Sequence, residues 1–290
     1  GEINISKLFK IFWHKKLLLF LMTISVTLLA YLSSLFIPNT YEAKVVLAPV
    51  NENNGISTSQ GFSSIAAIAG INMPSSSPVK SLQALEQLSS FSFFENNIYP
   101  FIDSKDLLAS KAWNEKKNLL EYDDSLYDVN KKQWLVMQPS IQTAYFEFIK
   151  ILSIKLNSQN GFITLSIEHE SPVLVKDWLD LIVKGINKEV RSDDYKANIL
   201  ALEYLNIQFN NTKNTEIKSA LADLIKSETK KMLLLEASEE YVYKILNSPF
   251  EPELPIGPNR ILISIISGLI GFFISLITAI IISLYKKNYS

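Results

Sequence analysis

Two long uninterrupted runs of apolar residues, one near each end, dominate the pattern of hydrophobic and polar positions along this chain. The first covers residues 17–37 and the second covers residues 261–285, and neither contains Asp, Glu, Lys or Arg. About 20 such residues are enough for a helix to cross the hydrocarbon core of a bilayer. The pattern therefore predicts two transmembrane helices, and the absence of charge inside them gives no indication of an ion or proton path.

Lysines beside the two runs predict their orientation. Four precede the first run and two follow the second: Lys7, Lys10, Lys15 and Lys16, then Lys286 and Lys287. Because basic residues favour the cytoplasmic side, we expect the tails 1–16 and 286–290 in the cytoplasm and residues 38–260 across the membrane. A secretory signal peptide is the alternative, but the first run is long for one and no small-residue cleavage motif follows it.

Between the runs, period-two and helical patterns alternate. Strands are expected over residues 41–50, 153–156, 162–167 and 240–246, and helices are expected from Pro78, around residues 107–120, from Pro139 and from Pro172. Gln159-Asn160-Gly161 is a strong turn signal that joins two of the strands into a hairpin. The mixture predicts an α+β domain.

The helix from Pro172 is expected to be unusually long. Apolar residues keep a helical spacing as far as about residue 210, which corresponds to a length of roughly 55 Å. A turn at residues 210–212 and a second helix over residues 215–237 would complete a helical protrusion at about 172–237. One small core cannot cover such a helix, so its apolar face is expected to need a partner.

A proline-rich strap leads into the second apolar run. Prolines recur at every third residue of 249–258 and favour a stiff, extended polyproline II segment: Pro249, Pro252, Pro255 and Pro258. In the second run, small residues fall on one helical face: Ser264, Gly268, Gly271, Ser275, Ala279 and Ser283. Small residues let helices approach closely in lipid, so we expect a contact with a neighbouring protomer or a membrane-embedded partner. Ordinary tolerance of glycine and serine is the alternative.

Composition excludes several classes of function. The formal net charge of -1 gives no basic face for nucleic acid, and the absence of cysteine excludes disulfides, thiolate metal sites and cysteine nucleophiles. The two histidines, His14 and His169, are expected to be structural. Residues 51–77 read as a loop, in which the apolar patch 61–73 is expected to pack on a neighbour or near the membrane surface.

The remaining candidates for chemistry are acidic. Asp123, Asp124 and Asp128 could bind a cation, but no glycine supports a calcium loop and we expect a solvated turn. Glu168 and Glu170 could form a glycosidase-like pair on one strand face, without an evident cleft. The pairs Asp193-Asp194 and Glu239-Glu240 are expected to be solvated. With no phosphate loop or nucleophile elbow, we predict no catalytic, cofactor-binding or metal residues and no enzyme activity.

The order of these elements resembles the polysaccharide co-polymerase, or Wzz-type chain-length determinant, family. Four segments carry the resemblance: Pro38-Asn39-Thr40-Tyr41, the helix SLQALEQLSSFSFFENNI, the junction EHESPVLVKDWLDLIVKGIN, and the proline strap with the glycine-bearing second run. One departure is Gly257-Pro258-Asn259-Arg260, where the family usually has Ser-Pro-Lys. The chain ends shortly after the second run and is expected to lack the cytoplasmic tyrosine-kinase module of related capsule regulators.

The resemblance implies a non-catalytic regulator of O-antigen (lipopolysaccharide) chain length in the bacterial inner membrane. It implies a homo-oligomer in which two transmembrane helices flank a periplasmic α/β base domain with a long protruding helical hairpin. The implied partners are a membrane-embedded polysaccharide polymerase and the growing polyprenyl-diphosphate-linked polysaccharide. Three interpretations stay open beside it: a two-span periplasmic sensor that signals through a partner, an exopolysaccharide or capsule export co-polymerase, and a polysaccharide-processing enzyme.

Overall fold

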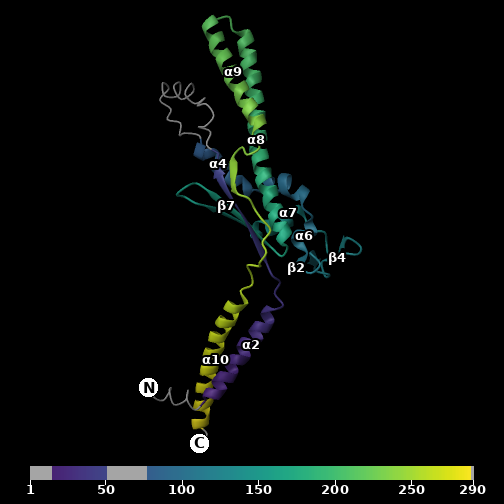
Figure 1. The fold of residues 1–290 in the computed structure, drawn as a ribbon, viewed down its shortest axis with the longest axis vertical. Coiled ribbons are helices and arrows are strands. Elements are labelled where there is room, and N and C mark those ends of the chain that lie inside the picture. The colour runs from purple at the N-terminus through teal and green to yellow at the C-terminus, as the bar shows by residue number, and fades with distance from the viewer. Residues whose placement is uncertain (1–14, 51–76, 289–290) are drawn as a thin grey trace. The chain divides into compact units, whose positions relative to one another are not determined.

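The computed structural model describes residues 15–50 and 77–288 and divides into two compact units (Figure 1). Unit 1 comprises Gly1–Tyr41 and Leu254–Ser290, and unit 2 comprises Glu42–Glu253. The predictions for His14 and for the apolar patch 61–73 lie outside the described residues.

Unit 1 is a pair of long apolar helices. Helix α2 spans Lys16–Ser34 and helix α10 spans Arg260–Asn288, in the stretches predicted from the two apolar runs. Both are long and apolar enough to cross a membrane, and they pack against each other. Large apolar side chains stay exposed on the outside of the pair, including Phe20, Ile265 and Leu269. An exposed apolar surface of this kind is suited to lipid.

A four-stranded sheet forms the centre of unit 2. Its strands lie in the order β6-β7-β1-β8 and span Leu152–Leu156, Ile163–His169, Tyr41–Pro49 and Tyr243–Asn247, respectively. Alternate residues of β1 point into the core, namely Tyr41, Ala43, Val45 and Leu47. The predicted final strand thus returns beside the first, with Pro49 opposite Tyr243.

The β6–β7 hairpin has the predicted turn. Gly161 has φ +72°, a conformation that glycine adopts without steric cost. A Cβ placed on Gly161 would lie 3.8 Å from Cγ of Pro49, so the end of β1 lies beside the start of β7. It follows that the start of β1 and the end of β7 share the opposite end of the sheet.

Short helices and an aromatic cluster complete the core of unit 2. The helical elements are α4 (Ser77–Leu88), α5 (Phe91–Phe93), the π-helix η2 (Phe94–Ile98), the 3-10 helix η3 (Tyr99–Phe101), α6 (Ser104–Leu108) and α7 (Ile141–Ile151). The ring of Phe94 lies 5.1 Å from Phe148 and 5.8 Å from Tyr145, between ring centroids. Offset aromatic contacts at these distances add to the stability gained from burial.

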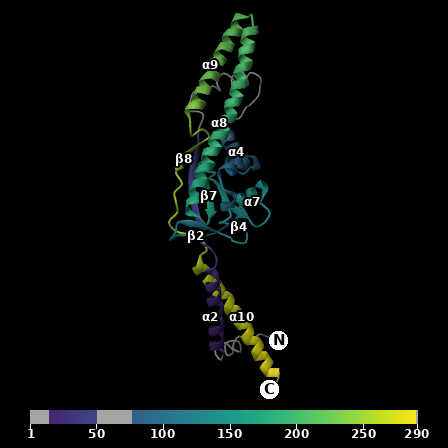
Figure 2. The same cartoon turned by 90° about the vertical axis from the view of Figure 1, so that its right-hand side faces the viewer.

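The long helix and its return form the predicted helical hairpin (Figures 1 and 2). Helix α8 spans Pro172–Asn211 and helix α9 spans Thr215–Ala237, with side-chain caps from Ser171 and Asn214. The first half of α8 is buried in the core through residues such as Val175, Leu179 and Ile186. Beyond it the two helices pack on each other and leave apolar side chains exposed, including Leu200, Tyr204 and Leu233.

The helix predicted around residues 107–120 is wrong beyond Leu108. The structure has strand β2 (Ser110–Asn114) paired with strand β3 (Leu119–Tyr122), followed by the small hairpin β4 (Tyr127–Asp128) and β5 (Gln133–Trp134). Asn118 takes the left-handed conformation, with φ 52°, in the turn between β2 and β3. Asparagine tolerates this conformation and an α-helix does not, so the helical pattern cannot continue there.

Candidate functional site

The small-residue face of α10 contacts helix α2 of the same chain. A Cβ placed on Gly268 would lie 3.2 Å from Oγ1 of Thr27, and one on Gly271 would lie 3.0 Å from Cβ of Val26. Ser275 is fully buried on the same face, and Ser264 is half-buried. The face predicted from the sequence is therefore a helix–helix contact within unit 1, and contact with a second chain through these residues stays a prediction.

Close packing holds this contact together. The hydroxyls of Thr23 and Thr27 donate to carbonyl oxygens one turn back on α2, at 2.8 and 2.9 Å. Those of Ser264 and Ser275 donate to carbonyls of α10, at 2.8 and 2.7 Å. These hydroxyl groups are satisfied within their own helices. The two helices can therefore pack this closely because Gly268 and Gly271 have no side chains.

The two chain segments that lead from the helices to unit 2 pair with each other next to the helix ends. The backbone N–H of Thr40 donates to the carbonyl of Gly257 at 3.0 Å, and the N–H of Ile256 donates back to Thr40 at 2.8 Å. Arg260 donates to Oδ1 of Asn39 at 2.8 Å. A Cβ on Gly257 would lie only 2.9 Å from the hydroxyl of Thr40. A larger residue at position 257 would therefore force the Thr40 side chain to turn or the two segments to move apart.

The proline strap enters this junction. Pro258 is half-buried beside Gly257, whereas Pro255 is exposed and Pro252 is half-buried. From Ser248 to Asn259 the chain forms no helix or strand, has a bend at residues 253–254 and makes one bridge at Gly257. The polyproline II conformation of the strap and its role in assembly stay predictions.

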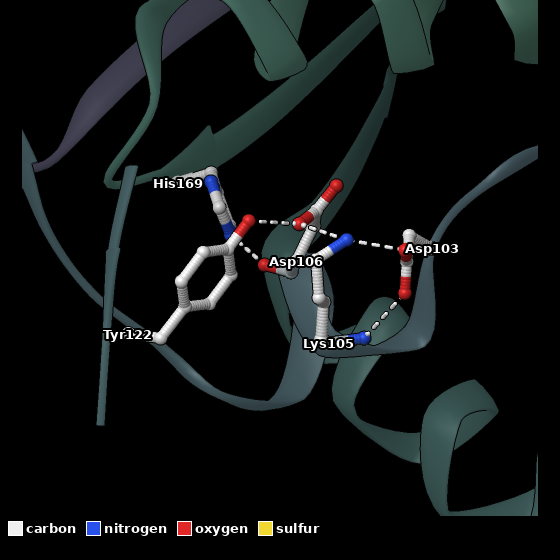
Figure 3. A network of polar contacts seen from close by, with 5 residues as sticks. All are labelled: Asp103, Lys105, Asp106, Tyr122 and His169. Carbon is white, nitrogen blue, oxygen red and sulfur yellow. Dashed lines mark hydrogen bonds and ion pairs between the residues drawn. The ribbon is translucent and has the colours of Figure 1, made fainter. Parts of the chain in front are cut away.

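A polar network joins strand β7 to helix α6 and strand β3 (Figure 3). His169 is 4% exposed, and its Nε2 lies 2.8 Å from the carbonyl oxygen of Asp106. Its Nδ1 accepts a hydrogen bond of 3.1 Å from the backbone N–H of Ser171, so the ring proton lies on Nε2. Burial lowers the pKa of His169 and outweighs the attraction of Glu170, which favours the neutral ring. His169 thereby fixes the residue that caps α8.

Charged groups next to the histidine are paired. The hydroxyl of Tyr122 donates to Oδ1 of Asp106 at 2.6 Å, and Lys105 pairs with Asp103 and Asp106. Burial opposes the charged form of Lys105, but the two carboxylates outweigh it and raise the pKa of the lysine. Burial and the hydrogen bond to Asp106 raise the pKa of Tyr122, which stays protonated. The network is suited to holding α6 and β3 against the sheet.

Only one residue of the acidic pair considered at Glu168 and Glu170 lies within a strand. Strand β7 ends at His169, so Glu170 lies beyond it, where it accepts a hydrogen bond of 2.8 Å from the hydroxyl of Ser110. Glu168 is exposed. The two carboxylates therefore lack the arrangement on which a glycosidase-like interpretation depended.

Two of the aspartates after β3 accept hydrogen bonds from groups within their own turns. Oδ1 of Asp123 accepts from the N–H and hydroxyl of Ser125, and Oδ1 of Asp128 accepts from the N–H groups of Asn130 and Lys131. These hydrogen bonds lower the pKa of both carboxyls. Among the described residues, no group of three or more His, Asp and Glu is placed to hold a metal ion.

Asn187 is a buried hub that sequence reasoning missed. Its Oδ1 accepts from the N–H groups of Tyr241, Val242 and Tyr243 at 2.8–3.0 Å. Its Nδ2 donates to the carbonyls of Tyr243 and Val183 at 3.0 and 3.1 Å. The chain that returns from the helical hairpin is thus anchored to α8 just before it enters the sheet. A polar residue within an apolar stretch of helix was the only signal in the sequence.

Asp194 is also not the solvated charge that was predicted. It pairs with Lys80 at 2.5 Å and accepts a hydrogen bond from the hydroxyl of Tyr241. Burial, then the hydrogen bond to Asp194, raise the pKa of Tyr241 to about 12. This network joins α4, α8 and the segment that precedes β8. Its members are far apart in the sequence, and no local pattern connects them.

A shallow cavity of about 350 Å³ lies where the hairpin meets the rest of unit 2. Arg191, one of its lining residues, donates to the carbonyl of Ser238 at 2.6 Å, which ties α8 to the end of α9. Basic, aromatic and acidic side chains line it: Lys188, Arg191, Ser192, Tyr195, Leu235 and Glu236. It is open, and its basic groups are partly engaged within the chain.

Comparisons with known proteins address the family. Residues 1–109 match the family model described as Wzz, chain length determinant protein. One similar solved structure is a full-length bacterial polysaccharide co-polymerase, 12% identical in sequence to this chain, with a TM-score of 0.47. The match covers 96% of this chain and 97% of that protein's chain. A fragment of WzzB, the polysaccharide co-polymerase from Salmonella Typhimurium, is 12% identical with a TM-score of 0.29, and covers 76% of this chain and 100% of its own.

No curated protein matches the chain. The identities and TM-scores of the two solved structures are too low to support a functional argument. The family model rests on sequence and covers α2, β1 and α4 through α6. The predicted resemblance to the Wzz-type chain-length determinant family is therefore confirmed over residues 1–109.

Proposed function

We propose that this chain regulates the length of surface polysaccharide chains without catalysing their synthesis. The observation that carries the proposal is the match of residues 1–109 to the chain-length determinant family. Three polar residues of types that often act in catalysis support the proposal, because each of them makes a structural hydrogen bond. His169 caps a helix through Ser171, Asp106 binds Tyr122, and Glu170 binds Ser110.

We further propose that α2 and α10 span the bacterial inner membrane and that unit 2 lies in the periplasm. The lysines before residue 17 and after residue 285 support this orientation. The exposed apolar residues of the α8–α9 hairpin support a homo-oligomer, because large apolar patches rarely stay uncovered. In this proposal the oligomer acts with a membrane-embedded polymerase on polyprenyl-diphosphate-linked polysaccharide, with the O-antigen of lipopolysaccharide as the polymer.

The strap and the helix pair are the proposed route between the periplasmic unit and the membrane. Gly268 and Gly271 bind α2 to α10, so the two helices would present one common outer surface to the polymerase. Pro252, Pro255 and Pro258 would stiffen the segment that leads into α10. The backbone pairing of Thr40 with Gly257 supports this arrangement, because it joins both links at one point.

Deletion of the gene from its host, followed by gel electrophoresis of the surface polysaccharide, tests the proposal. We expect polymer to remain while its preferred length is lost. Complete loss of polymer would favour a polysaccharide-processing enzyme. An unchanged ladder would favour a sensor, and loss of capsule with normal lipopolysaccharide would favour an export co-polymerase.

A further inference from the structure

The small β4–β5 hairpin carries a concentrated exposed apolar surface. We name residues 129–137 the apolar loop. Four of its side chains are largely exposed: Val129 at 48%, Leu135 at 51%, Val136 at 46% and Met137 at 93%. Single exposed apolar residues are common on proteins, but the three successive ones directly after β5, Leu135, Val136 and Met137, indicate a surface that is covered in use.

The hairpin presents these side chains from a defined scaffold. Tyr127 pairs with Trp134 across the two strands, and their rings meet edge to face at 5.4 Å. The N–H of Leu135 donates to the carbonyl of Leu126 at 2.9 Å. Oδ1 of Asp128 holds the turn at Asn130. The apolar side chains are therefore exposed although the hairpin that holds them is fixed by strand pairing, an aromatic contact and side-chain hydrogen bonds.

The hairpin belongs to the end of unit 2 at which the chain enters from α2. The ring of Tyr127 lies 6.0 Å from that of Tyr122, which binds Asp106, and Asp106 in turn binds His169 at the end of β7. The end of β7 shares its side of the sheet with the start of β1 at Tyr41. Figures 1 and 2 show β2 and β4 at the end of unit 2 opposite the tip of the α8–α9 hairpin.

The length of the connecting chain limits how far this end can lie from the bilayer. Ile37 ends the apolar run and Tyr41 begins β1, four residues later. A fully extended chain covers at most about 3.6 Å per residue, so these two residues are at most ~14 Å apart. The headgroup layer adds roughly 5–8 Å on each side of the hydrocarbon core. Strand β1 therefore begins close to the lipid headgroups.

The residue types of the apolar loop favour a lipid surface as the partner, although Asp123, Asp124 and Asp128 precede its lysines and leave the hairpin without a basic excess. Lys131 and Lys132 are exposed in its turn, and Lys131 also pairs with Asp128 at 3.5 Å. Trp134 adjoins the exposed apolar residues. Lysine, tryptophan and aliphatic side chains together are typical of segments that lie in the membrane interface, where lysines attract anionic headgroups.

We propose that the apolar loop inserts into the headgroup region of the bilayer that α2 and α10 span. The proposal rests on the proposed membrane location of those helices. Insertion of Leu135, Val136 and Met137 would give unit 2 a third attachment to the membrane, in addition to its two covalent links. Three attachments would fix the tilt of the periplasmic unit, which two neighbouring links alone leave free.

Site-directed spin labelling of the full chain tests this, because the sequence contains no cysteine that would react in addition. One variant is Val136→Cys, and its matched control is Leu156→Cys. Leu156 has a similar exposure of 44% and lies opposite Ile163, near the other end of the sheet. Each protein is labelled and placed in nanodiscs of phosphatidylethanolamine and phosphatidylglycerol. Accessibility to oxygen, which concentrates in lipid, is compared with accessibility to a water-soluble nickel chelate.

We expect an oxygen-to-nickel ratio several-fold higher at residue 136 than at residue 156. Equal ratios would overturn the proposal. A low accessibility to both reagents at residue 136, with spin–spin broadening that disappears on dilution with unlabelled chain, would also overturn it, because a second copy would then cover the loop. A third label at Leu269→Cys, on the exposed side of α10, tests the premise that α10 lies in the membrane. A lipid signal there with a water signal at residue 136 refutes only the loop insertion, whereas water signals at both refute the membrane location itself.

Discussion

Gly271→Leu should separate the two apolar helices by forcing a side chain into their contact. A Cβ at residue 271 would already lie 3.0 Å from Cβ and 3.2 Å from Cγ1 of Val26, and 3.5 Å from the Cα of Thr23. The Thr23 atom belongs to the backbone and cannot turn away. Leucine adds three more carbons beyond Cβ, so α2 must move away as a whole. Overpacking of this kind costs about 1–3 kcal/mol, and contacts between membrane helices contribute about 1–2 kcal/mol.

Disulfide formation between α2 and α10 measures the separation. The pair Thr27→Cys and Gly268→Cys is suitable, because a Cβ on Gly268 would lie 3.2 Å from Oγ1 of Thr27, the position that a cysteine sulfur at residue 27 can take. These would be the only thiols in the chain. Since about 1.4 kcal/mol corresponds to a tenfold change, Gly271→Leu should slow oxidation of the pair by roughly tenfold or more.

The control places the same leucine on the lipid side of the helix. Ile270 is exposed, so Ile270→Leu should leave the rate of disulfide formation unchanged. Membrane insertion should be normal in both variants, because leucine is at least as apolar as the residue it replaces. Equal oxidation rates in the Gly271 and Ile270 variants would show that the contact is absent and that the glycine is merely tolerated.

Three further predictions concern unit 2 and the strap. Asn187→Leu leaves several buried backbone groups unpaired and should lower the free energy of unfolding by about 2–4 kcal/mol. Tryptophan fluorescence in denaturant measures this change. The control, Asn206→Leu on the exposed part of α8, should change the free energy of unfolding little. Because burial lowers the pKa of His169 in the folded state, the unfolded state binds more protons as the pH falls through ~6.5. Stability should therefore fall below that pH, by at most about 1.4 kcal/mol per pH unit, and His169→Gln should flatten the slope. Pro252→Ala with Pro255→Ala should shift the distribution of polysaccharide lengths at unchanged protein level, and an unchanged distribution on a gel would remove the strap from the mechanism.

The elements with strong periodicity could be predicted from the sequence. The alternation of Tyr41, Ala43, Val45 and Leu47 gives β1, and the long helical spacing after Pro172 gives α8. Asn160-Gly161 gives the β6–β7 turn. Each of these signals lies within a short stretch of sequence, as a repeat of apolar positions or as a turn dipeptide. The sequence alone is therefore enough to locate each element.

The strands after α6 could not be predicted in this way. Strands β2 to β5 have two to five residues each, too few for a period to be recognised. Long-range polar contacts secure them, including Tyr122 with Asp106 and Ser110 with Glu170. The hub at Asn187 and the pair of Lys80 with Asp194 were missed for the same reason, because partners far apart in the sequence leave no trace in a local pattern.

The identity of the partner on the small-residue face was also beyond the sequence. The spacing of Gly268 and Gly271 indicates that a helix packs closely there, but it does not say which helix. In the structure the helix is α2 of the same chain, which fits through Val26 and Thr27. The surface available to a polymerase or a second protomer is then the outer face of the pair, where Leu269 and Phe273 are exposed.

Polymer length and polymer amount, measured together, distinguish a length regulator from a polymer-forming enzyme. In a strain that lacks the gene, the full chain is supplied from an inducible promoter, and the surface polysaccharide is labelled with a radioactive sugar. If the chain regulates length without catalysing synthesis, a preferred length emerges as the protein level rises, while the total sugar incorporated per cell stays constant. A total that rises in proportion to the protein, with no preferred length, would contradict this regulatory role and indicate an enzyme.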